Sequence, residues 1–210
     1  MPLIGDKAPE FKAVTTMGEI NFPEDKSGKW SILFSHPADF TPVCTTEFMG
    51  FQDLKEEFDK INTDLLGYSV DGIHSHIEWI KNIKKTFDVD IEFPIVAGMD
   101  VAQKYGMLHS GSSNATVRAT FLINPDGIIE AILYYPMSNG RDIKEILRLT
   151  KALQKTYSDK VATPESWPNN ARLESDVIIP PASSIEESVA NEKNPNYKCY
   201  DWYMCTKKNN

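Results

Sequence analysis

Cys44 is the residue with the most conspicuous chemistry in this chain, because of the loop that precedes it. Residues 37–44 read Pro-Ala-Asp-Phe-Thr-Pro-Val-Cys, and they separate an apolar run at 30–34 from apolar residues at helical spacing. Cys44 is therefore expected at a strand–loop–helix junction, in the first turn of the helix. Free backbone N–H groups and the positive end of the helix dipole favour a thiolate there. Position alone leaves an alternative open, a buried cysteine that acts as a small apolar side chain.

The pattern Pro-x-x-x-Thr-x-x-Cys, formed by Pro37, Thr41 and Cys44, resembles the active-site signature of the peroxiredoxins. Further segments resemble the same family in the same order: 34–36, 45–47, Val-Arg-Ala-Thr-Phe at 117–121, Tyr-Tyr-Pro at 134–136 and Gly-Arg-Asp at 140–142. An Asp-Trp-Tyr motif at 201–203 is similar to the tail of the peroxiredoxin-6-like, 1-Cys-type subgroup, especially its archaeal members. The resemblance covers nearly the whole chain.

The resemblance implies a thiol-specific peroxidase that reduces hydrogen peroxide and organic hydroperoxides to water and alcohols. A thiolate at Cys44 would attack one peroxide oxygen and be left as a sulfenic acid. We predict no cofactor. A zinc site needs about four ligands. Beyond the three cysteines only scattered histidines remain, and His74 and His76 point to different sides of a helix, so we predict no metal either.

Thiolate formation alone cannot make a fast peroxidase. A thiol of pKa about 8.5 is already a few per cent ionised at pH 7. Complete ionisation therefore gains at most ~30-fold, or about 2 kcal/mol, and a lower pKa also weakens the nucleophile. Most of the acceleration must come from positioning the peroxide and from stabilising charge on the leaving oxygen.

This requirement assigns roles to the residues around Cys44. Arg118 is expected to hold the thiolate and the peroxide together through its several N–H donors, with a surface salt bridge as the alternative. Thr41 is expected to hydrogen-bond the peroxide, and it also suits a helix N-cap. Backbone N–H groups near Val43 would add donors. Pro37 would shield the pocket, unless it is a plain loop residue.

Three further residues are candidate supports of the site. His36 is adjacent to the loop, and the archaeal relatives imply an interaction with oxidised Cys44; a core or loop histidine is the alternative. Glu47 is expected to support an arginine. Arg141 also matches the family and is a candidate for that partnership, with an ordinary ion pair on the helix surface as the alternative for both residues.

The other two cysteines, Cys199 and Cys205, are spaced Cys-x5-Cys, so the chain lacks the Cys-x-x-Cys dithiol of thioredoxins. The resemblance implies that Cys205 of another subunit attacks the sulfenic acid and forms an interchain disulfide with Cys44, with Cys199 assisting or rearranging with it. The alternatives are a 1-Cys mechanism without a resolving cysteine, and a chaperone or redox sensor built on a peroxiredoxin scaffold.

Composition narrows the partners and the compartment. The chain has 210 residues, a net charge of −8 and no long basic cluster, so nucleic acid is not an expected partner. Neither a membrane span nor a signal peptide is recognisable, and a cytoplasmic location is expected. The resemblance implies a thiol reductant, such as a thioredoxin-like protein or a small dithiol, and dimers that assemble into a ring, a decamer.

Strand and helix patterns alternate over the first ~155 residues. Strands are expected at 32–34, 65–70, 93–97, 120–123 and 128–134, and helices at 45–61, 74–86, 100–105 and 142–157. This alternation predicts a partly parallel α/β sheet flanked by helices, which the resemblance specifies as thioredoxin-like. We predict a peroxidase domain at 1–157 and a C-terminal extension at 158–210, in which prolines interrupt regular elements and apolar residues contact a neighbouring subunit.

Overall fold

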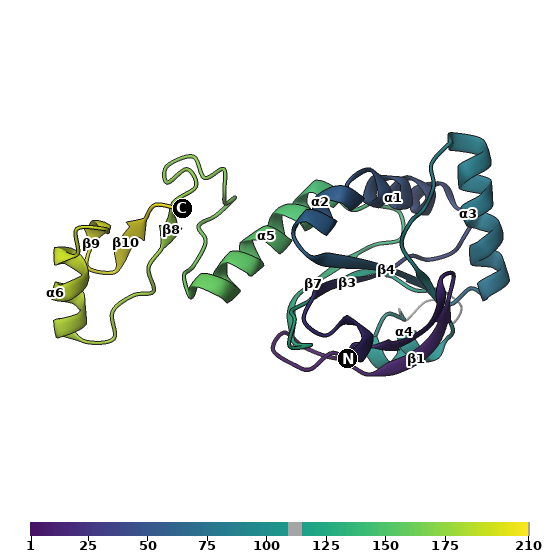
Figure 1. Cartoon of the computed structure of the whole chain (residues 1–210), viewed down its shortest axis with the longest axis horizontal. Helices are drawn as coiled ribbons and strands as arrows, with labels where there is room; N and C mark the ends of the chain where they lie inside the picture. The colour runs from purple at the N-terminus through teal and green to yellow at the C-terminus, as the bar shows by residue number, and fades with distance from the viewer. Residues whose placement is uncertain (109–114, 210) are drawn as a thin grey trace. The chain divides into compact units, whose positions relative to one another are not determined.

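The computed structural model describes residues 1–108 and 115–209. They form two compact units, Met1–Lys144 and Glu145–Asn210, and each is treated by itself (Figure 1). In the described part of the chain, no helix is long and apolar enough to cross a membrane.

Within the described residues, the first unit is built on a seven-stranded sheet of order β2-β1-β5-β4-β3-β6-β7. Its strands are β1 (Phe11–Thr15), β2 (Gly18–Phe22), β3 (Trp30–Ser35), β4 (Thr63–Ser69), β5 (Ile95–Ala97), β6 (Arg118–Ile123) and β7 (Ile129–Tyr135). Strands β3, β4 and β5 run parallel to one another, and the others join antiparallel. The remaining elements are η1 (Glu24–Lys26), α1 (Pro42–Asp53), α2 (Lys55–Lys60), α3 (Ile73–Phe87) and α4 (Asp100–Tyr105). The predicted thioredoxin-like fold, a mixed sheet flanked by helices, is confirmed.

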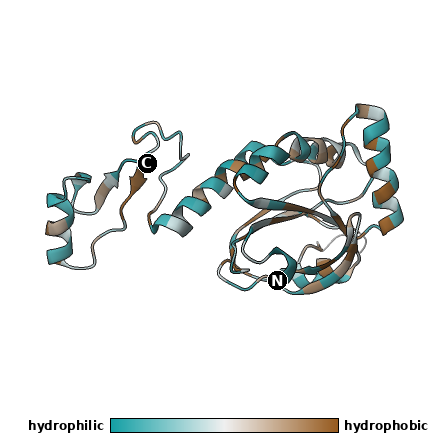
Figure 2. Ribbon diagram, viewed as in Figure 1, coloured by the Kyte–Doolittle hydropathy of each residue, from teal (hydrophilic) through white to brown (hydrophobic). Residues whose placement is uncertain are grey.

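The strand that leads into the loop before Cys44, β3, is buried along its whole length. Its side chains alternate between two apolar layers, as the period of a strand requires. Leu33 faces a core cluster that includes Tyr105 of α4, whereas Phe34 stacks on Phe51 of α1 with ring centroids 3.9 Å apart. Figures 1 and 2 show α1 over one face of this sheet and hydrophobic residues along its strands.

Gly67 allows α1 to lie close against the sheet. It is the partner of Phe34 in the parallel register of β3 and β4. A Cβ atom at Gly67 would lie 2.9 Å from the Phe48 ring of α1, too close for any larger residue without displacement. The missing side chain therefore fixes the depth at which the Cys44-bearing helix packs.

The predicted elements of this unit are present, with two differences. The helix expected at 45–61 begins earlier, at Pro42, and it is interrupted at Leu54, between α1 and α2. The strands β1 and β2 form an antiparallel hairpin that the sequence patterns did not predict.

The second unit contains short regular elements that lie between the prolines of this segment and that the sequence patterns did not predict. They are β8 (Val177–Ile178), α6 (Ile185–Lys193), β9 (Lys198–Asp201) and β10 (Met204–Lys207), and α5 (Ile143–Asp159) leads into the unit. The three strands form a small sheet of order β8-β10-β9. A minor core of Ala152, Val161, Trp167 and Val177 holds the segment that follows α5.

Candidate functional site

Cys44 lies in the first turn of α1, as the sequence predicted. Pro42 is the first helical residue, and its missing N–H costs nothing at that position. The Cys44 side chain is fully buried, and it is the free cysteine of the chain. A buried thiol at a helix N-terminus lies where backbone N–H groups and the helix dipole favour negative charge.

The loop residues that precede Cys44 form one side of the site. Thr41 stands at the N-cap position in extended conformation, but its side chain makes no capping bond. Its hydroxyl instead donates to Ala38 O at 2.9 Å, and its oxygen lone pairs remain able to accept. Pro37 is buried, and Val43, the residue directly before Cys44, is partly buried.

Arg118 approaches Cys44 from the first residue of β6. Its Nη1 donates to Cys44 Sγ at 3.3 Å and to Glu47 Oε2 at 2.6 Å. Its Nε and Nη2 both donate to Met137 O, at 3.0 and 2.7 Å. Arg118 is only 2% exposed, so a surface salt bridge is excluded.

Glu47 lies between two guanidinium groups. Besides Arg118, it accepts two parallel bonds from Arg141 Nε and Nη2, each 2.8 Å, and one from the Arg141 backbone N–H. Burial by itself would raise the pKa of Glu47, but the hydrogen bonds and charge of Arg141, with the charge of Arg118, hold it below its ordinary value. The Arg141 guanidinium also lies 5.5 Å from the centre of the Phe34 ring.

The charges of this cluster do not balance without Cys44. Two buried arginines face one ionised glutamate, which leaves one positive charge in excess. A thiolate at Cys44, in contact with Arg118, neutralises that excess. The geometry therefore favours an anionic sulfur and, beside it, any substrate oxygen on which negative charge develops.

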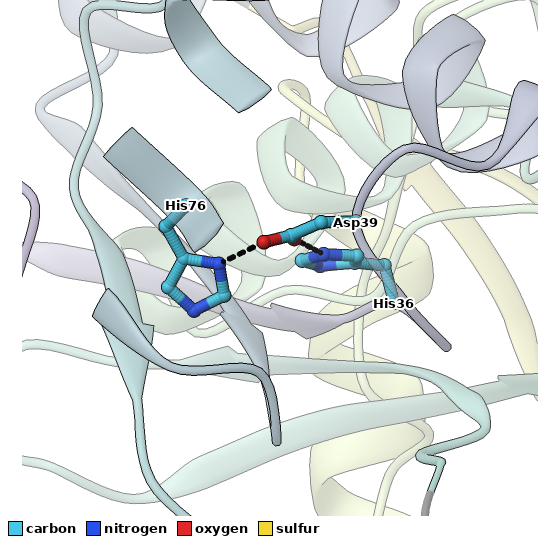
Figure 3. A group of neighbouring side chains, drawn as sticks. All are labelled: His36, Asp39 and His76. Atoms are coloured by element: carbon cyan, nitrogen blue, oxygen red, sulfur yellow. Dashed lines mark hydrogen bonds and ion pairs between the residues drawn. The ribbon is translucent and has the colours of Figure 1, made fainter. Parts of the chain in front are cut away.

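A second buried polar cluster, not predicted from the sequence, joins the loop to α3 (Figure 3). The Asp39 carboxylate is bonded through Oδ1 to His36 Nε2 and through Oδ2 to His76 Nδ1, both at 2.8 Å. No hydrogen bond joins His36 to Cys44 among the described residues; the His36 ring packs on Phe48 and Trp79. The sequence reasoning missed Asp39 and His76, which are 37 residues apart.

This cluster also has the side chains of a metal site, because one ligand atom from each residue lies within 4.8 Å of the others. The outer nitrogens, His36 Nδ1 and His76 Nε2, argue against that use. Both are buried without a hydrogen-bond partner among the described residues, whereas metal-bound imidazoles usually donate their second N–H. Each imidazole has one nitrogen engaged with Asp39, and the outer nitrogens have no partner in the described part of the chain to which they could donate, so hydrogen bonding within the cluster suits these residues better.

The electrostatics of the second cluster agree with that assignment. Burial would raise the pKa of Asp39, but the hydrogen bonds from His36 and His76 lower it well below its ordinary value. Burial lowers the pKa of His36, and the bond to Asp39 only partly offsets this. An ionised Asp39 between imidazole donors is the resulting state at neutral pH.

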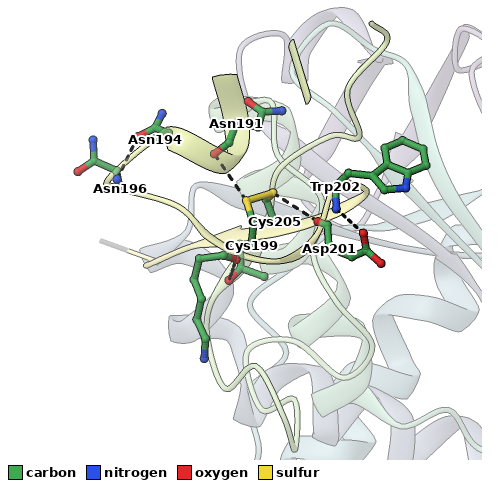
Figure 4. The surroundings of a disulfide bond; sticks show 9 residues. Asn191, Asn194, Asn196, Cys199, Asp201, Trp202 and Cys205 are labelled. Atoms are coloured by element: carbon green, nitrogen blue, oxygen red, sulfur yellow. Dashed lines mark hydrogen bonds between the residues drawn. A yellow bond between two sulfur atoms is a disulfide. The ribbon is translucent and has the colours of Figure 1, made fainter. Parts of the chain in front are cut away.

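The two tail cysteines lie in the second unit and are joined to each other (Figure 4). They are register partners on the antiparallel strands β9 and β10. Cys199 Sγ lies 3.6 Å from Asn191 O at the end of α6, and Cys205 is 3% exposed.

A thioredoxin-like sheet that carries a buried, arginine-bound cysteine in the first turn of a helix defines the class of cysteine-dependent peroxidases. The AhpC/TSA family model matches residues 4–132, more than half of the chain, and the chain belongs to this peroxiredoxin family. It is accordingly a peroxidase, an enzyme of the oxidoreductase class.

Relatives of full length agree with this membership. Peroxiredoxins of Chlorobaculum tepidum and Methanosarcina mazei are 53% and 51% identical, each over 99% of this chain and 98% of the relative. Among solved structures, a yeast mitochondrial 1-Cys peroxiredoxin is 41% identical with a TM-score of 0.86 over the whole of both chains. The peroxiredoxin 6 of Arenicola marina is 32% identical with a TM-score of 0.85, over 100% of this chain and 99% of that one.

Replacing Glu47 should reveal how strongly the arginine pair depends on it. Glu47→Gln is expected to lower the free energy of unfolding at pH 7 by about 3–5 kcal/mol, because two buried guanidinium groups lose their carboxylate. The pKa of Glu47 is lowered in the folded chain below its ordinary value of 4.5. The contribution of ionised Glu47 to the free energy of unfolding is therefore complete above pH 4.5 and is lost as the pH falls through the pKa of the folded chain. The gap between variant and wild type should therefore narrow below pH 4.5.

Denaturant titrations at a series of pH values measure this gap. The matched control is Glu78→Gln, in an exposed pair with Lys81 on α3 in which both side chains are 68% exposed, and it should have little effect. A deficit of Glu47→Gln that stays constant from pH 7 to about pH 3 would contradict the ionised role of Glu47.

Proposed function

We propose that the chain reduces hydrogen peroxide and organic hydroperoxides at Cys44. The contact of Arg118 Nη1 with Cys44 Sγ, inside a buried cluster with one excess positive charge, is the observation that carries this proposal. The Cys44 thiolate attacks one peroxide oxygen, the O–O bond breaks, and the second oxygen leaves as water or alcohol after it takes up a proton. Cys44 is left as a sulfenic acid.

Arg118 can serve the sulfur and the peroxide together. A guanidinium carries five N–H donors. The bonds to Cys44, Glu47 and Met137 engage Nε–H, both Nη1 hydrogens and one Nη2 hydrogen among the described residues. The second Nη2 hydrogen is proposed to bind the peroxide, together with backbone N–H groups near Val43 and the Thr41 hydroxyl. Pro37 excludes water from the pocket, and Glu47 with Arg141 holds Arg118 in place.

The tail supplies the second half of the cycle. We propose that the Cys205 thiol of another chain attacks the Cys44 sulfenic acid, which forms an interchain disulfide and releases water. Cys199 then attacks Cys205, so that Cys44 leaves as a thiolate and the Cys199–Cys205 disulfide forms. The pairing of these two residues on β9 and β10 supports the exchange. A thiol reductant, a thioredoxin-like protein or a small dithiol, then reduces the tail pair.

The segment 158–210 is thus proposed as an extension that makes subunit contacts and delivers the resolving cysteine, in a cytoplasmic enzyme whose dimers form a ring, a decamer. Exposed apolar side chains support association. Phe40 is 55% exposed in the first unit, and Trp202 and Tyr203 are 53% and 56% exposed in the second.

Arg118→Lys tests the peroxide-binding role. The variant keeps the positive charge but loses the planar set of donors, and we expect the second-order rate of Cys44 oxidation to fall by about 100-fold. Stopped-flow measurement with hydrogen peroxide on the reduced protein gives this rate. Arg148→Lys in α5, where Arg148 pairs with Glu145, is the matched control and should keep the wild-type rate. Equal rates for both variants would refute the role of Arg118.

Single serine variants distinguish the roles of the two tail cysteines, with non-reducing gels run after peroxide treatment as the measurement. Cys205→Ser should abolish the interchain disulfide band, whereas Cys199→Ser should make it accumulate, because nothing then releases Cys44 from Cys205. Persistence of the band in Cys205→Ser would refute the resolving role. A band of wild-type intensity in Cys199→Ser would refute the exchange step.

A further inference from the structure

The cycle proposed above places two incompatible demands on Cys44. Contact with Arg118 requires the buried position in which the side chain is fully inaccessible. A disulfide with a cysteine of another chain requires the same sulfur to become accessible. The loop 36–41 and the first turn of α1 must therefore move, and the contacts that fasten this loop set how readily they do so.

The tip of the loop is fastened mainly through Asp39. Its carboxylate is bonded to His76 in the first turn of α3, and its backbone N–H donates to Asp71 Oδ2 at 2.9 Å. The His76 bond reaches the loop from a separate helix, as Figure 3 shows. The next residue, Phe40, has a left-handed backbone with φ of 56°, and its side chain is 55% exposed. A bulky residue persists in that conformation only where its neighbours enforce it.

His76 is chemically suited to act as the fastener. It is wholly buried, and its Nδ1 supplies one of the two side-chain donors of an ionised Asp39. A hydrogen bond to a buried charge is among the stronger ones in a protein, and its loss leaves the charge poorly compensated. Breaking this one bond therefore destabilises the closed loop far more than breaking a bond between neutral groups.

We propose that His76 is a positioning residue for Cys44. His76 holds the loop closed through Asp39 while peroxide reacts, and its bond to Asp39 breaks when the loop opens for disulfide formation. His76 touches neither Cys44 nor peroxide in this scheme. Only the opening of the loop for disulfide formation rests on the proposed function. The closed loop is needed for the contact between Arg118 and Cys44 in any case.

The first experiment does not depend on the resolving cysteine. In the Cys199→Ser/Cys205→Ser background, the alkylation of reduced Cys44 by iodoacetamide reports how often the loop opens. His76→Leu should raise the alkylation rate by about tenfold or more. His76→Asn, whose amide nitrogen can occupy the Nδ1 position, should recover most of the wild-type behaviour. His74→Leu, an exposed position in the same turn, is the matched control and should leave the rate unchanged.

The second experiment uses the chain with all three cysteines. Quench-flow samples analysed by mass spectrometry separate the oxidation of Cys44 from the formation of its disulfide. His76→Leu should slow the first step and accelerate the second, and it should lower the fraction of Cys44 oxidised to sulfinic acid at high peroxide. A general loss of structure would not slow the oxidation of Cys44 and at the same time accelerate the formation of its disulfide.

The outcomes distinguish the role of His76 in holding the loop closed from the proposed resolution by Cys205. Unchanged alkylation in His76→Leu, or equal effects of His76→Leu and His76→Asn, would overturn the role of His76. A raised alkylation rate, with Asn rescue but no Cys44–Cys205 disulfide in any variant, would support the fastening role and refute the proposed resolution by Cys205.

Discussion

The buried excess of positive charge beside Cys44 is the constraint on which the rest of the structure depends. Arg118 and Arg141 share a single carboxylate, Glu47, and a thiolate completes the balance. Burying such a cluster is costly unless each group is hydrogen-bonded in good geometry. The structure meets that condition with residues from α1, from the start of β6 and from the segment between β7 and α5, so the sheet must hold these segments in register.

This charge balance makes the dipole of α1 a minor contributor to the stability of a thiolate at Cys44. A helix dipole is worth a few tenths to about 1 kcal/mol at an exposed position, which is little compared with a direct guanidinium contact in a buried site. The position of Cys44 in α1 matters chiefly because it aims the sulfur at Arg118. The packing of Phe48 over Gly67 and of Phe51 on Phe34 fixes that aim, and the loop that ends at Thr41 completes it.

The sequence predicted the part of the site that depends on local pattern. The apolar run of β3 and the helical spacing after Cys44 placed the sulfur in the first turn of a helix, and family resemblance identified Arg118 and Arg141. The bond between Asp39 and His76 could not be predicted, because it joins positions 37 residues apart and hydrogen bonding leaves no periodic signal. The hairpin β1–β2 was missed because the prediction rested on continuous apolar runs, whereas buried and exposed residues alternate in these two strands, the pattern of a half-buried strand. The pairing of Cys199 with Cys205 depends on a strand register that the spacing alone does not give.

Consumption of peroxide in a single turnover, without any reductant, tests the central claim most directly. We expect the fully reduced wild-type chain to consume peroxide rapidly, with Cys44 oxidised in step with the peroxide lost. A Cys44→Ser chain that retains Cys199 and Cys205 should show no rapid consumption. Equal consumption by the two proteins would contradict the assignment of peroxide reduction to Cys44 and to the charge cluster built around it.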